Sequence, residues 1–127
     1  MDVQEISFFR EMPSVIPLYE TLWAMLMSRW PNTAITVQKS QIAFRQNGHP
    51  YCRVWLPTFK RLKGISGDAL MITLGFRYPL NNSRVAAMAE PYPNRWTIHI
   101  PIHTLNDVDE ELLDFIKESH AIAQTLR

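Results

Sequence analysis

The chain has 127 residues, a formal net charge of +1, and a composition that is 46% hydrophobic and 20% charged, which is typical of one globular domain. No apolar run approaches the roughly 20 residues of a membrane span, and the acidic start at residues 1–5 does not resemble a secretory signal. The single cysteine, Cys52, excludes an internal disulfide framework and a zinc site built on cysteine pairs, so we expect one cytoplasmic domain over residues 1–127, without a metal or other cofactor.

The first quarter of the chain predicts helices. Residues 6–12 form a short apolar segment that ends at Pro13, which favours one or two helical turns. Ser14 is expected to cap a longer helix that reaches about Trp30, because apolar residues recur there at helical spacing. The apolar arc of this helix is wide, so we expect it to be well buried, with Trp23 in its middle.

The middle of the chain predicts strands. Residues 36–46 and 51–56 alternate between apolar and polar side chains, and the Asn47-Gly48 pair between them is a strong hairpin signal. A basic loop over residues 58–67 then leads to a third alternating segment at residues 68–77. We expect these three strands to be antiparallel neighbours.

The last third predicts one or two strands and a helix. Residues 85–89 form a candidate short strand, and residues 96–102 alternate clearly, although Pro101 places that strand at an edge or at its end. A final helix is expected over residues 107–125, capped by Asn106 or Asp107. The whole order predicts an α+β two-layer sandwich, in which an antiparallel sheet of three to five strands carries the N- and C-terminal helices on one face.

Strand alternation then predicts what the other face of the sheet carries. If Phe44, Val54, Ile72 and Ile98 point at the helices, the opposite face gathers arginines, aromatic rings and a histidine. Its expected members are Arg45, Tyr51, Arg53, Trp55, Met71, Thr73, Arg77, Thr97 and His99. Guanidinium forks and aromatic planes suit phosphates, carboxylates and stacked rings. An ordinary solvated face, or one covered by a second subunit, is the alternative interpretation.

The charge distribution agrees with a basic surface. Residues 39–84 contain eight basic residues and one acidic residue, whereas both ends of the chain are acidic. Such an asymmetry either pairs oppositely charged elements within the fold or attracts an anionic partner.

Five short motifs resemble one bacterial family, the domain of unknown function 5655. They are F-F-R-E-M-P at 8–13, L-Y-E-T-L at 18–22, K-S-Q-I-A-F-R at 39–45, R-W-T-I-H-I at 95–100 and D-V-D-E-E-L at 107–112. The resemblance covers nearly the whole chain and implies a small cytoplasmic α+β domain with an accessory or binding role. It implies no catalytic residues. The polar positions within these motifs that stand out are Lys39, Arg45, Arg95 and His99.

Three functions remain open from the sequence. The first is a binding or accessory module whose basic and aromatic face meets an anionic small molecule or a nucleic acid. The second is a homodimer that packs Trp55 and Tyr51 across a two-fold axis, and the third is an enzyme that uses His99 as acid or base with Lys39 or Arg45 stabilising an anion. No catalytic signature or metal-ligand set is visible. The candidate ligand-binding residues are Lys39, Arg45, Tyr51, Arg53, Trp55, Arg77, Arg95 and His99.

Overall fold

The computed structural model describes residues 1–58 and 62–126, and this part of the chain forms an open antiparallel sheet with three α-helices. The helices are α1 (Val3–Phe8), α2 (Ile16–Arg29) and α3 (Glu110–Ala123). The strands are β1 (Ala34–Val37), β2 (Ile42–Gln46), β3 (His49–Trp55), β4 (Leu70–Phe76), β5 (Ala87–Tyr92) and β6 (Arg95–Ile102). Short 3₁₀ helices at Pro13–Val15 and Leu105–Asp107 precede α2 and α3.

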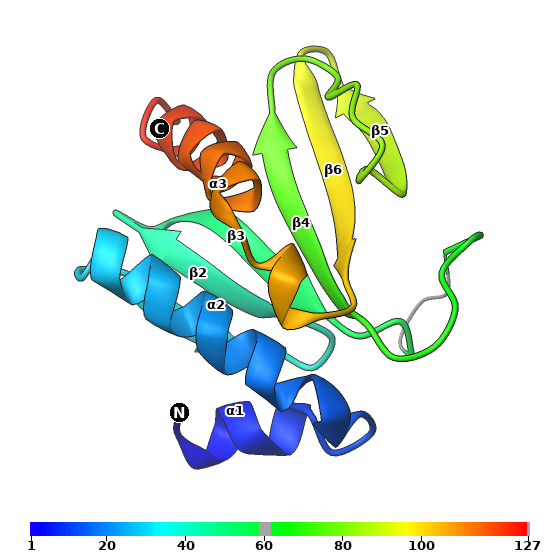
Figure 1. Ribbon diagram of the computed structural model, residues 1–127. Helices are drawn as coiled ribbons and strands as arrows, with labels where there is room; N and C mark the ends of the chain where they lie inside the picture. Colours follow the sequence, from blue (N-terminus) through cyan, green and yellow to red (C-terminus); the bar gives the residue numbers. More distant parts are fainter. Residues whose placement is uncertain (59–61, 127) are drawn as a thin grey trace.

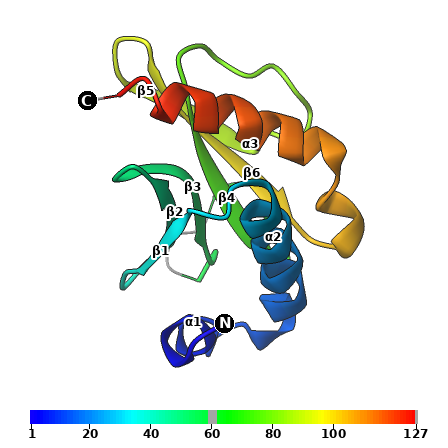
Figure 2. The same ribbon diagram turned by 90° about the vertical axis from the view of Figure 1, so that its left-hand side faces the viewer.

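The α+β class is confirmed, and the sheet of the described residues has six strands, where the sequence predicted three to five. Their order is β1-β2-β3-β4-β6-β5, and every neighbouring pair is antiparallel (Figure 1 shows β2 to β6, and Figure 2 shows β1 beside β2). The difference arises partly at residues 36–46, which were predicted as one strand. A turn divides them into β1 and β2, closed by a hydrogen bond of 2.8 Å from the Gln38 amide to the Gln41 carbonyl.

Helices α2 and α3 lie on the same face of the sheet, as Figures 1 and 2 show from two directions. Each contributes apolar side chains at helical spacing to one continuous core, including Leu22 and Leu26 from α2 and Leu112 and Ile116 from α3. All four are fully buried. Burial of this kind is the main favourable term for the fold, at about 1.5–3 kcal/mol for each large side chain.

The starts of the two long helices differ from the sequence prediction. Ser14 lies in the 3₁₀ helix before α2, where its hydroxyl donates to the Asp68 carboxylate instead of capping. Asp109 caps α3 by accepting from the Leu112 amide at 2.9 Å, whereas Asp107 belongs to the preceding 3₁₀ helix. Helix α2 has Val15 at its start and no side-chain cap, whereas Thr104, Asp107 and Asp109 all lie near the start of α3, so sequence alone did not select among them.

The sheet is not continuous between β3 and β4. The two strands pair only where Arg53, Val54 and Trp55 face Thr73, Ile72 and Met71. Beyond Arg53 and Thr73 no further residues of the two strands are in register, although both strands continue. This separation of β3 and β4 creates the cleft described below.

Candidate functional site

The helix-facing side of the sheet is the one predicted from alternation. Phe44, Val54, Ile72 and Ile98 are all fully buried in the core that α2 and α3 complete. The sheet register places Val54 opposite Ile72 and Ile98 opposite Leu74, so these apolar residues share one face.

Tyr51 was predicted on the face of the sheet away from the helices, and this prediction was wrong. The β2–β3 register shifts after Phe44, which pairs with Cys52, while Arg45 pairs with Pro50. Tyr51 is therefore an extra residue of a β-bulge, which interrupts the alternation of side chains along β3. It is 1% exposed, and its ring packs against Trp30 and His120 on the helix side.

Trp55 was predicted on the solvent side, and it is instead covered by the loop that follows β3. Only 8% of it is exposed, because Leu62 and Ile65 of that loop pack over Trp55 and its neighbour Met71. The homodimer hypothesis used Trp55 and Tyr51 as contact residues, and both are buried within the chain itself. Two of the basic residues predicted for this loop, Lys60 and Arg61, lie outside the described residues.

The uncovered half of this face contains a cleft of about 330 Å³ where β3 and β4 separate. One wall is formed by Pro50–Arg53 of β3, and the other by parts of β4, β5 and β6. The last turns of α3 close the bottom. The residues that line it are Pro50, Tyr51, Cys52, Arg53, Thr73, Gly75, Phe76, Pro91, Tyr92, Arg95, Trp96, Thr97, Ser119, Ile122, Ala123 and Leu126.

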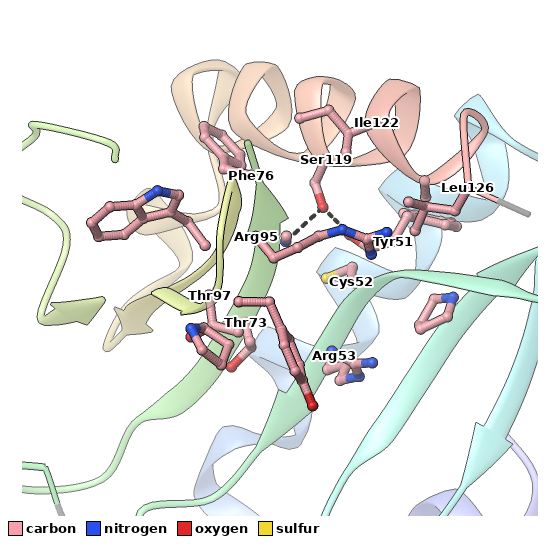
Figure 3. A pocket seen from close by; sticks show the side chains of 16 residues that line it. Tyr51, Cys52, Arg53, Thr73, Phe76, Arg95, Thr97, Ser119, Ile122 and Leu126 are labelled. Carbon is pink, nitrogen blue, oxygen red and sulfur yellow. Dashed lines mark hydrogen bonds between the residues drawn. The ribbon is translucent and has the colours of Figure 1, made fainter. Parts of the chain in front are cut away.

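Ser119 holds the two separated strands in place from below. Its hydroxyl accepts a hydrogen bond of 3.0 Å from the Gly75 amide of β4 and donates one of 2.7 Å to the Tyr51 carbonyl of β3 (Figure 3). Ser119 is 2% exposed, so both bonds are shielded from water. One side chain thus takes the place of a ladder hydrogen bond and fixes the width of the cleft.

Two arginines are the cationic groups of the cleft lining. Arg53 is partly buried on β3, and its Nε atom is buried without a hydrogen-bond partner among the described residues. Arg95 is exposed at the start of β6, and in Figure 3 its side chain extends across the cleft toward β3. Burial, and then the charge of the nearby Arg45, lower the pKa of the Arg53 guanidinium.

The remaining predicted site residues are placed differently. Arg45 is close to Arg53, and its side chain donates to the Gly48 carbonyl at 3.4 Å, whereas Arg77 donates to the Thr125 hydroxyl just beyond α3. Lys39 is exposed beside α1, in a different hollow. The structure therefore brings Arg53 and Arg95 together in the cleft lining and places Arg45 near Arg53, whereas Arg77 and Lys39 lie elsewhere.

His99 is held in place by a chain of hydrogen bonds. The Trp55 indole donates to the Thr73 hydroxyl at 2.8 Å, and the same hydroxyl lies 2.7 Å from His99 Nδ1. The indole can only donate, so the Thr73 hydroxyl proton is available for His99. The Trp55 and His99 rings also meet edge to face at 5.7 Å. Thr73 thereby joins the cleft lining to His99.

A family model described as a domain of unknown function (DUF5655) matches residues 5–123, which is nearly the whole chain. The chain belongs to the DUF5655 family. Comparisons with curated proteins and with solved structures found no match. The family membership confirms the resemblance seen in the sequence motifs, and it assigns no activity.

Several important residues of this DUF5655 domain were not predicted from the sequence. Ser119 lies within a helical pattern, where a serine gives no sign that it will bridge two strands 44 and 68 residues away. Gly75 lies within the alternating segment predicted over residues 68–77, and Tyr92 lies in β5 beyond the short strand predicted over residues 85–89. The proline pair around Tyr92 was the available signal, because Pro91 is compatible with an edge strand such as β5.

The electrostatics of the cleft are one-sided. No aspartate or glutamate is among its lining residues, and the ion pairs of the described residues lie elsewhere, at Arg84 and Lys117. No group of three or more histidine, cysteine, aspartate or glutamate residues within the described ranges is arranged to hold a metal ion. Among the helices of residues 1–58 and 62–126, none has the length and apolar character needed to cross a bilayer.

Proposed function

We propose that this DUF5655 domain is a binding module that holds an anion in the cleft between β3 and β4. The observation that carries the proposal is that Arg53 is partly buried and has a buried N–H group without an acceptor among the described residues. A buried guanidinium N–H without an acceptor is costly, roughly 1–3 kcal/mol or more for a charged donor, and native structures rarely leave one. Arg53 Nε is such a donor among the described residues, and Arg53 is one of the residues that line the cleft.

A bound anion removes two unfavourable features at once. Its charge compensates the partial burial of the Arg53 guanidinium, which is the main reason that the pKa of Arg53 is lowered, and it offsets the repulsion from Arg45, which adds to that shift. Arg95 adds a second guanidinium from the opposite wall. Arginine pairs of this kind bind carboxylates and phosphates through parallel N–H bonds.

The size of the cleft favours a small anion over a polymer. About 330 Å³ is near the lower end of the range of roughly 300–1,000 Å³ for small-molecule pockets. The basic groups that would extend a nucleic-acid path, Arg77 and Lys39, lie outside the cleft lining. An accessory role, in which the domain recognises an anion for a partner module, agrees with this geometry.

The test is calorimetric titration of the parent chain and Arg53→Gln with inorganic phosphate, acetate, benzoate and a short single-stranded DNA, each at two salt concentrations. Arg77→Gln is the matched control, because it removes the same charge from outside the cleft. We expect at least one small anion to bind, and Arg53→Gln to weaken it about tenfold or more while Arg77→Gln does not.

Two results would count against this function. Binding of none of the panel, or equal binding by Arg53→Gln and the parent, would remove the reason for the proposal. The second such result is that only DNA binds, that its affinity falls steeply as the salt concentration rises, and that Arg53→Gln and Arg77→Gln weaken it equally. A general basic surface would then replace the cleft as the binding site.

A further inference from the structure

We infer that the anion bound in this cleft is a small hydrophobic carboxylate, with an aromatic or branched aliphatic body inside and the carboxylate at the arginines. This inference rests on the proposed function and adds the class of ligand. It comes from how polarity changes between the bottom and the rim of the cleft.

The bottom of the cleft is apolar and closed to solvent. Phe76, Ala123 and Cys52 are each 3% exposed or less and offer carbon and sulfur surfaces. Burial raises the pKa of the Cys52 thiol to about 12, so it carries no charge near neutral pH. A ligand that reaches this depth gains by burying apolar surface, at about 25 cal/mol for each Å².

The hydroxyl groups of the inner lining are already used within the fold. Ser119 accepts from Gly75 and donates to Tyr51, and the Tyr51 hydroxyl bonds Thr33 at 2.7 Å. Thr73 is engaged by Trp55 and His99. A nucleobase or sugar placed here would bury polar edges without partners, which costs roughly 1–3 kcal/mol for each group. An apolar body has no such cost.

Gly75 provides the space for that body. Its position in β4 faces Thr97 on β6, and a Cβ added to it would meet no heavy atom within 4 Å. The strand therefore presents bare backbone to the cleft at the point where β3 has moved away. A flat ring can pack against backbone at such a position, where any larger residue would occupy the same volume.

The rim of the cleft supplies the charge. Arg95 is exposed there, beside its strand partner Tyr92, whose ring is also exposed, and Arg53 contributes a second, partly buried guanidinium from β3. A carboxylate is planar and has two oxygens, which match the fork of a guanidinium. An apolar body with one carboxylate thus satisfies both the bottom and the rim.

The experiment follows the amide signals of the isotope-labelled chain by NMR during titration with 2-naphthaleneacetate. Acetate tests the carboxylate without the aromatic ring, and 2-naphthaleneacetamide tests the aromatic ring without the negative charge. Inorganic phosphate tests whether a different anion binds equally well. The chain has four glycines, so the Gly75 amide is readily assigned as the reporter of the cleft. We expect saturable Gly75 shifts, and affinity for 2-naphthaleneacetate about tenfold or more above that for acetate and for the amide.

Two variants locate the ligand. Gly75→Val puts a branched side chain into this space, where its Cβ would meet no heavy atom within 4 Å, and Arg95→Gln removes charge from the rim. Each should weaken binding of 2-naphthaleneacetate roughly tenfold or more. Ala34→Val is the control for Gly75→Val, because it enlarges an exposed strand residue outside the cleft. Should Gly75→Val fail to fold, Arg95→Gln and the parent titrations still decide the matter.

The outcomes separate this inference from the proposed function. If phosphate or acetate binds as well as 2-naphthaleneacetate and Arg53→Gln weakens it, the anion site stands and the hydrophobic carboxylate is wrong. Equal affinity for the neutral amide would show an apolar pocket without anion recognition, and this overturns both. No shift at Gly75 with any ligand also overturns both.

Discussion

The bridge made by Ser119 gives the sharpest prediction about stability. Ser119→Ala removes the acceptor of the Gly75 amide and the donor to the Tyr51 carbonyl, at a residue that is 2% exposed. Each lost hydrogen bond costs about 1 kcal/mol, and up to about 3 kcal/mol where the remaining partner is buried. Tyr51 is buried and Gly75 is exposed, so the larger cost applies to the Tyr51 carbonyl.

The expected net loss is about 2–3 kcal/mol in the free energy of unfolding, because alanine regains roughly 0.5 kcal/mol of helix propensity. Urea denaturation followed by circular dichroism measures it. Ser28→Ala is the matched control, since it changes an exposed serine of α2 and reports the propensity gain alone. If Ser119→Ala is as stable as Ser28→Ala, Ser119 does not support the cleft as we describe.

Three further predictions concern other parts of the fold. Burial lowers the pKa of His120, so the unfolded chain takes up a proton on this imidazole more readily than the folded chain does. The contribution of neutral His120 to the free energy of unfolding is therefore complete above the unfolded pKa of about 6.5 and is lost as the pH falls below it. His120→Gln should flatten the dependence of the urea midpoint on pH between neutral and mildly acidic conditions. Tyr19→Phe removes the donor to the buried Glu5 carboxylate and should cost about 2–3 kcal/mol in urea denaturation, whereas an unchanged midpoint would show that Glu5 finds another partner. Asp109→Ala should cost about 1 kcal/mol of stability through loss of the α3 cap, and Asn106→Ala should cost less; the reverse order would restore the cap predicted from the sequence.

The parts of the fold that depend on local alternation were predictable. Phe44, Val54, Ile72 and Ile98 lie in the core because each belongs to a strand whose apolar side chains recur at every second residue. For Pro101 the sequence left two positions open, and the strand end was right whereas the sheet edge was wrong. Its strand, β6, lies inside the sheet, but the β5–β6 pairing extends only to His99, so Pro101 has no strand partner on that side.

The site was harder to predict because it depends on interruptions of that pattern. A single bulge after Phe44 turns Tyr51 to the helix side, so strict alternation along residues 51–56 assigns its side chain to the wrong face. Trp55 is buried by Leu62 and Ile65 of the following loop, a contact that period and composition do not encode. The separation of β3 from β4 depends on Ser119 of α3, which is distant in sequence from both strands.

Arg53 illustrates what such a prediction can and cannot supply. The face of the sheet on which Arg53 lies follows from its alternation with Val54, and its positive charge follows from the residue type. Its buried Nε and its nearness to Arg45 depend on how β2 and β3 pair around the bulge. The basic character of the face was therefore predictable, whereas the position of the cleft within it was not.

The central claim, that the cleft between β3 and β4 binds an anion through Arg53, is tested most directly by one paired titration. The parent chain and Arg53→Gln are each titrated with 2-naphthaleneacetate and with phosphate, and the Gly75 amide signal is followed by NMR. Our account predicts a saturable shift of the Gly75 signal in the parent and an affinity about tenfold or more lower in Arg53→Gln, because this variant removes a guanidinium charge from the cleft lining. The same shift and affinity in both chains, or no shift in either, would contradict it.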